Sequence, residues 1–371
     1  MKIALCTPFK PLEHPSVSGD VTIARDLRQT LVELGVEMVT LPFFPAKEIY
    51  FKPTRWTGAA RALNSMVEEA QGVDAWLTFG SYYKVPDVFG PSGARRLGVP
   101  YCIFQASYAE NRRKKLATLP GYLLNRRAML RADHVFCNRT NDLAGCAKLL
   151  PADRYSHIRP GLPEGLLGRN EAEGARLRQA WETGSARVIV TAAMMRDGVK
   201  AKGLEWVFRS CAELIERRRD IYLVVAGDGP RKRELEAKAR SLLGRRVRFL
   251  GLVERAELAS VFSAADLFAF PGLKESVGMV YLEAQQCGLP VVATDDEGAP
   301  QVVAHDHTGI ITETTHQAFT KGMDTLVRDL ALCTSLGNQA PAYVAEYHSA
   351  RRNYGLVVDV MQKLSNKRAS Q

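Results

Sequence analysis

Short apolar runs alternate with longer amphipathic segments along almost the whole chain. The runs are nearly continuous in apolar residues, as strands are when a parallel sheet buries both of their faces. They predict strands at residues 2–7, 36–41, 75–79, 101–104, 134–137, 187–192, 221–226, 247–250, 267–270 and 289–293. The segments between them repeat their apolar positions with a helical period. This alternation predicts an α/β protein built from doubly wound parallel sheets.

The chain is too long for one hydrophobic core, so we expect two domains in its 371 residues. Prolines and glycines cluster at residues 158–165 (IRPGLPEG), a composition typical of a linker. We therefore predict domains at residues 1–163 and 164–346. A final helix is predicted at residues 347–371, and its spaced apolar residues fit docking of one face.

Composition and charge narrow the class of protein. A hydrophobic content of 46% with 24% charged residues is typical of a soluble globular protein. We expect neither a membrane span nor a signal peptide, because no apolar run is long enough and the first residues predict a strand. Seven scattered cysteines without a CxxC pair indicate reduced thiols in the cytoplasm and no zinc site. The net charge of +10 favours phosphate-rich substrates, anionic lipids or nucleic acid as partners.

Residues 266–298 (DLFAFPGLKESVGMVYLEAQQCGLPVVATDDEG) predict a strand, a loop, a helix and a second strand. We expect the helix to begin near Val277, with Ser276 as its cap, and to end at Gly288. Backbone amides at a helix start have no partner within the helix and form a site for an anion such as a diphosphate. Here these amides belong to Gly278, Met279 and Val280.

Two glutamates flank this helix start. Glu283 lies roughly 7 Å further along the helix axis than Gly278, which is about the reach from a diphosphate to the ribose of the same nucleotide. Its carboxylate can accept two hydroxyl hydrogen bonds, so we interpret Glu283 as a ribose clamp. Glu275 precedes the helix and would lie on the side of the transferred group. The alternative is that both are surface charges stabilised by the helix dipole.

The same residues carry a resemblance to a known family. Glu275 and Glu283, within PGLKESVGMVYLEAQQCGLPVVAT, closely resemble the E-x7-E signature of retaining nucleotide-sugar glycosyltransferases with the GT-B fold, and most closely those of the family numbered 4. The resemblance covers most of the C-terminal half strongly and the N-terminal half weakly. It implies two Rossmann-like domains that face a cleft, with the donor held mainly by the second. It also implies a final helix that crosses back onto the first.

Basic residues follow the strand at 187–192 in the sequence MMRDGVKAKGLEW. Positive side chains at the carboxyl end of a parallel strand face the same crevice as the helix start at Gly278. They can bind phosphate and offset the charge that develops on a diphosphate leaving group. The R…KG pattern of the family assigns these roles to Arg196 and Lys202, with a spacing about one residue longer than usual. We expect these residues to lie in a loop, and Lys200 to be an ordinary solvent-exposed lysine.

The resemblance implies further contacts that are weaker in this sequence. Glycines in the GDGP turn would let the backbone approach a nucleotide, and backbone near Gly251 would receive the base. In the first domain, one glycine stands where relatives often have two, and a polar pair follows the strand at 101–104 where relatives have a histidine. The residues so implicated are Gly227 and Gly229, Leu252 and Val253, Gly19 with the adjacent Asp20, and Gln105 with Ser107. An ordinary turn glycine is an equal interpretation of Gly19.

The segment Asn111–Arg131 (NRRKKLATLPGYLLNRRAMLR) is the most basic of the chain and interleaves leucines with its charges. Two interpretations stay open. The segment can lie on an anionic membrane surface, where the acceptors of many such transferases reside. It can equally be a solvated helix packed on its own domain through its leucines, with Pro120-Gly121 marking a loop. No nucleic-acid fold or aromatic platform accompanies the charge, so we do not expect nucleic acid as a partner.

The resemblance implies transfer of a hexose from a nucleotide-diphosphate sugar, such as a UDP- or GDP-sugar, to an acceptor hydroxyl with retention at the anomeric carbon. We expect a glycan or lipid-linked acceptor, a role in cell-envelope glycan or glycolipid synthesis, and a position in the cytoplasm or at the inner face of the membrane. No cofactor or metal is expected, and the leaving phosphate would take the acceptor's proton. The alternatives are a sugar-nucleotide epimerase or hydrolase of the same fold, and a non-catalytic nucleotide-sugar-binding protein.

Overall fold

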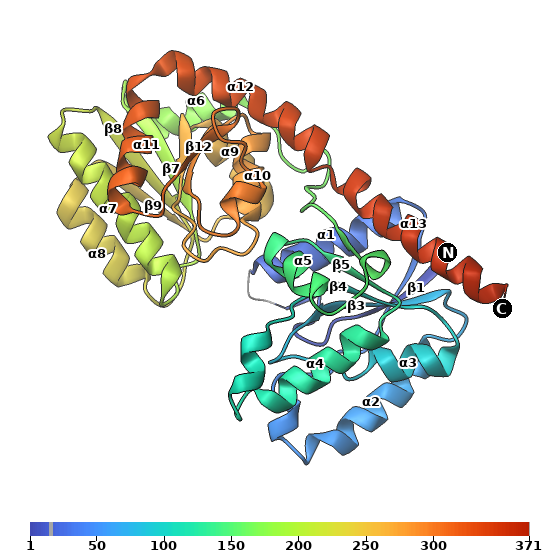
Figure 1. Ribbon diagram of the computed structural model, residues 1–371. Coiled ribbons are helices and arrows are strands. Elements are labelled where there is room, and N and C mark those ends of the chain that lie inside the picture. The colour runs from blue at the N-terminus through green and yellow to red at the C-terminus, as the bar shows by residue number, and fades with distance from the viewer. Residues whose placement is uncertain (15–17, 371) are drawn as a thin grey trace. The chain divides into compact units, whose positions relative to one another are not determined.

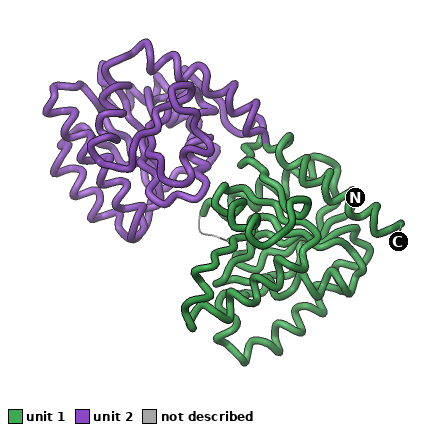
Figure 2. Tube along the Cα trace, viewed as in Figure 1, with its two compact units in different colours: residues 1–163, 350–371 green, residues 164–349 purple. Residues whose placement is uncertain are grey.

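The computed structural model describes residues 1–14 and 18–370; residues 15–17, in the loop after the first predicted strand, and Gln371 lie outside the described part. The chain divides into two compact units, residues 1–163 with 350–371 and residues 164–349 (Figure 2). Among the described residues each unit holds a six-stranded parallel sheet with helices packed against it (Figure 1). The predicted α/β class with two Rossmann-like sheets is confirmed.

The sheet of the first unit has the strand order β2-β1-β3-β4-β5-β6. Its strands are β1 (Lys2–Cys6), β2 (Glu37–Thr40), β3 (Ala75–Ser81), β4 (Tyr101–Ala106), β5 (His134–Cys137) and β6 (Tyr155–His157). The helices are α1 (Gly19–Glu33), α2 (Arg55–Glu69), α3 (Gly90–Leu97), α4 (Leu119–Arg131), α5 (Thr140–Ala147) and α13 (Ala350–Ala369). The chain order reverses between β1 and β3, so the loops after these strands diverge at one point of the sheet edge.

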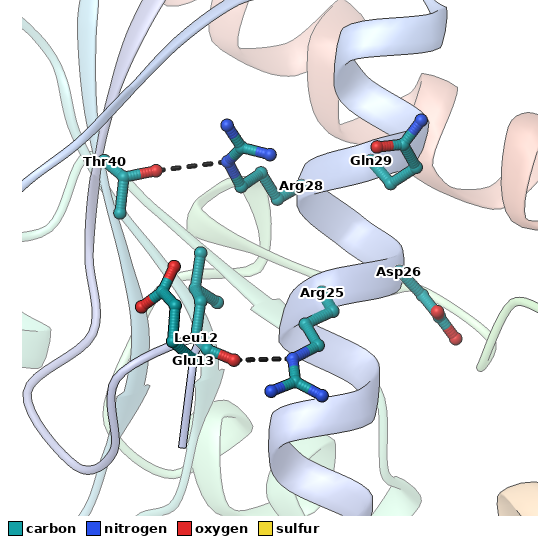
Figure 3. Close-up of a pocket in the computed structure, with 7 residues that line it drawn as sticks. All are labelled: Leu12, Glu13, Arg25, Asp26, Arg28, Gln29 and Thr40. Carbon is teal, nitrogen blue, oxygen red and sulfur yellow. Dashed lines mark hydrogen bonds between the residues drawn. The ribbon is translucent and has the colours of Figure 1, made fainter. Parts of the chain in front are cut away.

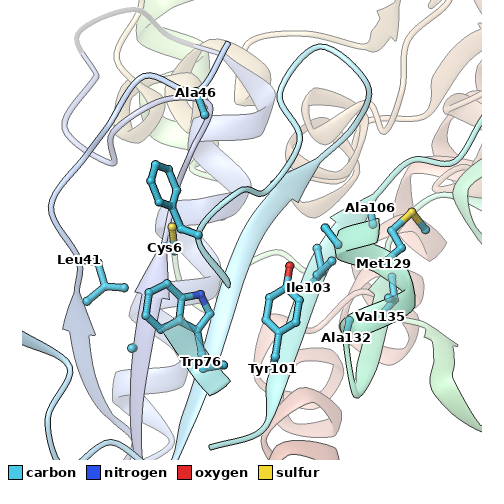
Figure 4. Close-up of a cluster of buried hydrophobic side chains, with 14 of the residues drawn as sticks. Cys6, Leu41, Ala46, Trp76, Tyr101, Ile103, Ala106, Met129, Ala132 and Val135 are labelled. Carbon is cyan, nitrogen blue, oxygen red and sulfur yellow. The ribbon is translucent and has the colours of Figure 1, made fainter. Parts of the chain in front are cut away.

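Buried hydrophobic side chains form the core of this unit, and Trp76 and Tyr101 are large aromatic residues among them (Figure 4). Trp76 on β3 and Tyr101 on β4 are paired in register, and both are buried. Their polar atoms are satisfied, as buried Trp and Tyr require: the Trp76 indole donates to Thr78 Oγ1 at 3.1 Å and the Tyr101 hydroxyl to Asp87 Oδ2 at 2.6 Å. The sheet is thereby held rigid beneath its loops.

The last helix belongs to the first unit. Helix α13 packs against α1, and the buried Tyr354 ring lies edge-on to Phe104 of β4, with 5.9 Å between the ring centroids. Gly161 allows this approach, because a Cβ there would lie 2.6 Å from Ala350 Cα. The helix begins at Ala350 rather than at the predicted residue 347, since α12 runs to Tyr347 and His348-Ser349 separate the two.

The second sheet has the strand order β12-β11-β10-β7-β8-β9. Its strands are β7 (Arg187–Ala192), β8 (Ile221–Ala226), β9 (Val247–Gly251), β10 (Leu267–Ala269), β11 (Val291–Thr294) and β12 (Gly309–Thr312). The helices are α6 (Glu171–Ala180), α7 (Val199–Glu216), α8 (Lys232–Leu243), α9 (Leu258–Ser263), α10 (Met279–Gln286), α11 (His316–Arg328) and α12 (Leu330–Tyr347). Here the order reverses between β7 and β10, which is where ligands bind in open sheets of this kind.

Two prolines lie inside helices. Pro120 stands in the first turn of α4, so the predicted loop at Pro120-Gly121 is wrong. Proline is tolerated in a first turn because its missing N–H has no partner there. Helix α12 continues through Pro341. Both helices are fixed by packing that a local pattern does not reveal.

All seven cysteines are buried and free of disulfides. Within residues 1–14 and 18–370, no helix combines the length and apolar character needed to cross a membrane. In the same residues no three His, Cys, Asp or Glu side chains are grouped as metal ligands would be.

Candidate functional site

The loops after β7 and β10 carry the main residues of the candidate site. The loop after β10 bears Glu275 and is held by the helix that follows it. The Tyr281 hydroxyl donates to the Phe270 carbonyl at 3.2 Å, and the buried Tyr281 ring lies so close to Gly278 that a Cβ there would be 2.4 Å away. Thr294 Oγ1 also donates to the Pro271 carbonyl at 2.7 Å. These contacts give the Glu275 loop one defined path.

Helix α10 begins at Met279, two residues later than predicted. Its cap is Gly278, whose φ of 76° is left-handed and favours glycine, and no side chain caps the helix. The prediction of Ser276 as the cap is therefore wrong, and Val277 is a buried residue of the loop. By helix geometry the amides of Met279 and Val280 have no partner within the helix, so the anion site predicted at this helix start keeps its chemical basis.

Helix α7 begins at Val199, so the two lysines lie in its first turns and not in the predicted loop. Lys200 and Lys202 are about 200° apart around the helix and point to different neighbours. The Lys202 ammonium is exposed and lies 6.0 Å from the centroid of the Trp206 ring. Lys200 instead forms an ion pair with Glu275. The prediction that Lys200 is an ordinary exposed lysine is wrong.

The Lys200–Glu275 pair is partly shielded from water. About a third of the Lys200 side chain (33%) and 18% of that of Glu275 are exposed. Burial, and then the positive charge of Arg196, lowers the pKa of the Lys200 ammonium to about 8. The shift also shows that Arg196 is near enough to act on Lys200. The structure thus brings Arg196, Lys200 and Glu275 together at the point where the strand order reverses.

The charge balance at this point is positive. Asp197, the acidic residue of the β7 loop, forms an ion pair with Arg231, with 2.9 Å between Asp197 Oδ1 and Arg231 Nη1. Glu275 is paired with Lys200, and Arg196 lies near enough to act on the same ammonium. An excess of positive charge beside free helix amides is suited to a diphosphate.

Glu283 is held by a residue that the sequence analysis missed. Arg255 Nε donates to Glu283 Oε1 at 2.6 Å, and only 8% of the glutamate side chain is exposed. Arg255 follows β9 in a short 3-10 turn at Arg255–Glu257, and α9 then brings the chain against α10. The one signal available was that Arg255 follows the predicted base-binding residues Leu252 and Val253. The Glu283 carboxylate therefore forms an ion pair with Arg255, which the interpretation of Glu283 as a ribose clamp did not include.

The glycines of the GDGP turn make close backbone contacts with the β7 loop. A Cβ on Gly227 would lie 2.0 Å from the Ala193 carbonyl oxygen, and one on Gly229 would lie 2.5 Å from that of Met195. These glycines thus allow the GDGP turn to lie close to the loop that carries Arg196. Beyond β9, Leu252 is 57% exposed, and Val253 is partly exposed. These two side chains are accessible to a ligand.

The residues predicted in the first unit meet at the carboxyl edge of its sheet. Gln105 Nε2 donates to Asp20 Oδ1 at 3.3 Å. Gln105 is only 7% exposed, and its backbone has a left-handed φ of 65°. Its side-chain Oε1 has no hydrogen-bond partner among the described residues. A strained backbone with an unsatisfied buried acceptor is typical of a functional site.

Gly19 and Ser107 have more ordinary surroundings. Gly19 is the first residue of α1 and has open space where a Cβ would lie, so neither a close approach nor a turn requires glycine there. The helix is capped instead by Ser18, whose Oγ accepts from the Val21 amide at 3.5 Å. The Ser107 carbonyl accepts a hydrogen bond from Asn125 Nδ2 at 2.9 Å, and its amide donates to the Ser81 carbonyl. Ser107 therefore connects β4 to α4.

A separate hollow of about 690 Å³ lies beside α1 in the first unit (Figure 3). Two arginines one turn apart on α1 face it. Arg25 donates to the Leu12 carbonyl at 2.5 Å, and Arg28 donates to Thr40 Oγ1 at 3.1 Å. Both guanidinium groups thus fix a loop or a strand to the helix, and none of the predicted site residues lines this hollow.

The basic segment 111–131 presents both charge and apolar groups. Helix α4 packs on its unit through the buried Tyr122, Ala128 and Met129 and the partly buried Leu130. Leu116 is 87% exposed and Leu123 is 53% exposed. Exposed basic residues accompany them, namely Arg113, Lys114, Lys115, Arg126, Arg127 and Arg131. The helix is therefore packed on one side and carries a basic, partly apolar surface on the other.

Part of the second unit matches a known family. Residues 189–343, which contain most of β7, the cations and both glutamates, match the family of glycosyl transferases group 1. The resemblance seen in the sequence is confirmed at this level, and the group 1 segment covers the whole region in which Arg196, Lys200 and Glu275 meet.

Two curated relatives are similar to part of this chain. A GDP-mannose-dependent alpha-(1-6)-phosphatidylinositol monomannoside mannosyltransferase of Mycolicibacterium smegmatis is 31% identical over 196 residues, which cover 50% of each chain. A D-inositol 3-phosphate glycosyltransferase of Corynebacterium jeikeium is 34% identical over 157 residues, or 40% of this chain and 38% of the relative. The chain spans about half the length, or less, of the curated relatives it matches.

Solved structures match the whole fold. The structure of HepE from Anabaena in complex with UDP superposes with a TM-score of 0.77, covering 98% of this chain and 100% of HepE at 18% identity. At this identity the likeness concerns the fold alone. The predicted GT-B fold class is thereby confirmed.

Proposed function

We propose that this chain transfers a sugar from a nucleotide-diphosphate sugar to an acceptor hydroxyl, with retention at the anomeric carbon and without a metal ion. The bond between the anomeric carbon and the diphosphate oxygen breaks, and a bond from that carbon to the acceptor oxygen forms. The acceptor's proton passes to the leaving diphosphate. Arg196 and Lys202 stabilise the charge on that diphosphate, together with the amides at the start of α10.

One observation carries this proposal. Two cations, Arg196 and Lys200, the carboxylate of Glu275 and a helix start lie where the strand order of the matched segment reverses. A diphosphate needs the positive charge, and a sugar needs a hydrogen-bond acceptor beside it. Glu275 is the acceptor for sugar hydroxyls in this proposal, while Glu283, held by Arg255, accepts the ribose hydroxyls. Leu252 and Val253 face the base, and Gly227 and Gly229 support the Arg196 loop.

Binding of a sugar nucleotide is the first test. A ligand that binds the native state raises the melting temperature of the protein. At a ligand concentration of a hundred times the Kd, the added stability is about 2.7 kcal/mol. We expect one base to be clearly preferred in a panel of UDP, GDP, ADP and their sugar conjugates with EDTA present, and GDP-mannose is the first donor to try because a relative is named for it. A 2′,3′-dideoxy form of the preferred nucleotide should bind more weakly, because it cannot contact Glu283.

The products then decide between transferase, epimerase and hydrolase. With an acceptor present, NMR should show a new glycoside of the same anomeric configuration as the donor. Release of free sugar or of an epimer without any acceptor would make the enzyme a hydrolase or epimerase. Binding without any turnover would favour the non-catalytic protein, and a requirement for a divalent ion would contradict the metal-independent reaction.

We further propose that Leu116, Leu123 and the basic residues around them bring this unit to an anionic membrane surface at the cytoplasmic side, where a glycan or lipid-linked acceptor is presented. The exposed leucines supply apolar contact and the exposed arginines and lysines supply charge. Gln105 and Asp20, which lie together at the edge of the first sheet, are then candidates for contacts to the acceptor or the transferred sugar.

Reversing two charges on α4 should weaken membrane binding. Each basic residue near an anionic surface contributes about 1 kcal/mol, so Arg126→Glu with Arg127→Glu should lower partitioning about thirtyfold or more. The measurement is co-sedimentation with vesicles of phosphatidylcholine and phosphatidylglycerol at low salt. The matched control is Arg95→Glu with Arg96→Glu on α3, which changes the net charge equally. Equal losses in both double variants would mean that only net charge matters, and the α4 surface would be ruled out.

A further inference from the structure

Lys200 lies between two groups at the edge of the second sheet. Its ammonium contacts Glu275 Oε2 and lies 5.4 Å from the centroid of the Phe270 ring. The ring in turn packs on α7, because a Cβ on Gly203 would lie 2.9 Å from it. Lys200 is thus confined by an aromatic face on one side and by a carboxylate on the other.

The position of Lys200 in its helix is electrostatically unfavourable. It is the second residue of α7, where the helix dipole favours carboxylates and disfavours cations. The neighbouring Arg196 adds to this cost and contributes to the low pKa of Lys200. Contact with Glu275 offsets both effects. Glu275 is the charged partner that stabilises Lys200 at this position, so pairing with Glu275 is its clearest role.

We propose that Lys200 is a positioning residue that holds the Glu275 carboxylate in place for the hydroxyls of the donor sugar, an inference that rests on the proposed function. The ion pair joins the Lys200 ammonium to Glu275 Oε2. A carboxylate that is already oriented loses little conformational freedom when the sugar binds. Lys200 therefore sets the preference of the site for a sugar nucleotide over the free nucleotide.

The test compares affinities for GDP-mannose and GDP, and for UDP-glucose and UDP, by calorimetry. Lys200→Met should lower the affinity for the sugar nucleotide that the wild type binds by about tenfold, while affinity for the free nucleotide changes by less than about twofold. Lys200→Arg, which can still pair with Glu275, should restore most of the preference. Lys202→Met is the matched control on the same helix, and it should weaken both ligands by the same factor because its assigned partner is phosphate.

Each outcome decides one of the two proposals. If Lys200→Met keeps the full preference for the sugar nucleotide, the positioning role is wrong while the sugar-transfer function stands. If it weakens nucleotide and sugar nucleotide equally, Lys200 is a phosphate ligand and the inference fails. A wild type without any preference overturns the proposed function as well. The double variant Lys200→Met with Glu275→Gln removes both charges and guards against misfolding; it should lose no more preference than Glu275→Gln alone.

Discussion

Replacing Glu275 by glutamine is expected to lower the rate of sugar transfer by about a hundredfold. Hydrogen bonds to a charged group contribute about 1.5–3 kcal/mol, and each 1.36 kcal/mol of barrier is a factor of ten in rate. Glutamine keeps the shape of the side chain but removes the charge that a sugar ring developing positive character would need. Affinity for the free nucleotide should stay within about twofold, because Glu275 lies on the sugar side of the predicted phosphate site. Initial rates and calorimetry measure the two effects.

The same substitution leaves Lys200 without its carboxylate, and this has to be separated from catalysis. An uncompensated, partly buried ammonium destabilises the fold, so Glu275→Gln should melt at a lower temperature than the wild type. Adding Lys200→Met should recover stability and leave the rate low. If the double variant recovers the rate as well, the loss in Glu275→Gln came from the stranded lysine, and Glu275 has no direct part in transfer.

Two central strands of the second sheet could be predicted to the residue. Arg187–Ala192 and Ile221–Ala226 were predicted with the bounds that the structure shows, because both strands are buried on two faces and read as continuous apolar runs. Helix starts were less predictable. Gly198 and Gly278 precede α7 and α10 with left-handed φ values of 90° and 76°. Glycine marks such a position, but the sequence does not show on which side of the glycine the helix begins.

That uncertainty explains the main error at the site. The side on which a helical lysine points depends on the residue at which the helix begins, and a shift of two residues turns a side chain by about 200°. The family pattern directed attention to Lys202, while the contact with Glu275 belongs to Lys200. Arg255 was missed for another reason. It reaches Glu283 through the packing of α9 beside α10, which is a tertiary contact without a local pattern.

Replacing Arg196 by methionine is expected to lower kcat by about a hundred- to a thousandfold, the size of effect found when a preorganised group that stabilises developing charge is removed. Charge on the leaving diphosphate grows as the sugar bond breaks, so Arg196 should contribute more to the transition state than to binding. KM should rise far less than kcat falls. Lys202→Met should show the opposite balance, since an exposed ammonium is screened by solvent and attracts the diphosphate before reaction as well as during it.

Steady-state kinetics with the preferred sugar nucleotide provide the measurement, and Arg233→Met provides the matched control. Arg233 is an exposed arginine of α8 in the same unit, so its loss changes the net charge equally without touching the loop after β7. That control should keep kcat within about twofold, as surface substitutions usually do. If Arg196→Met instead raises KM and leaves kcat unchanged, Arg196 stabilises the ground state and the transition state equally. The charge on the leaving diphosphate must then be stabilised by the amides at the start of α10.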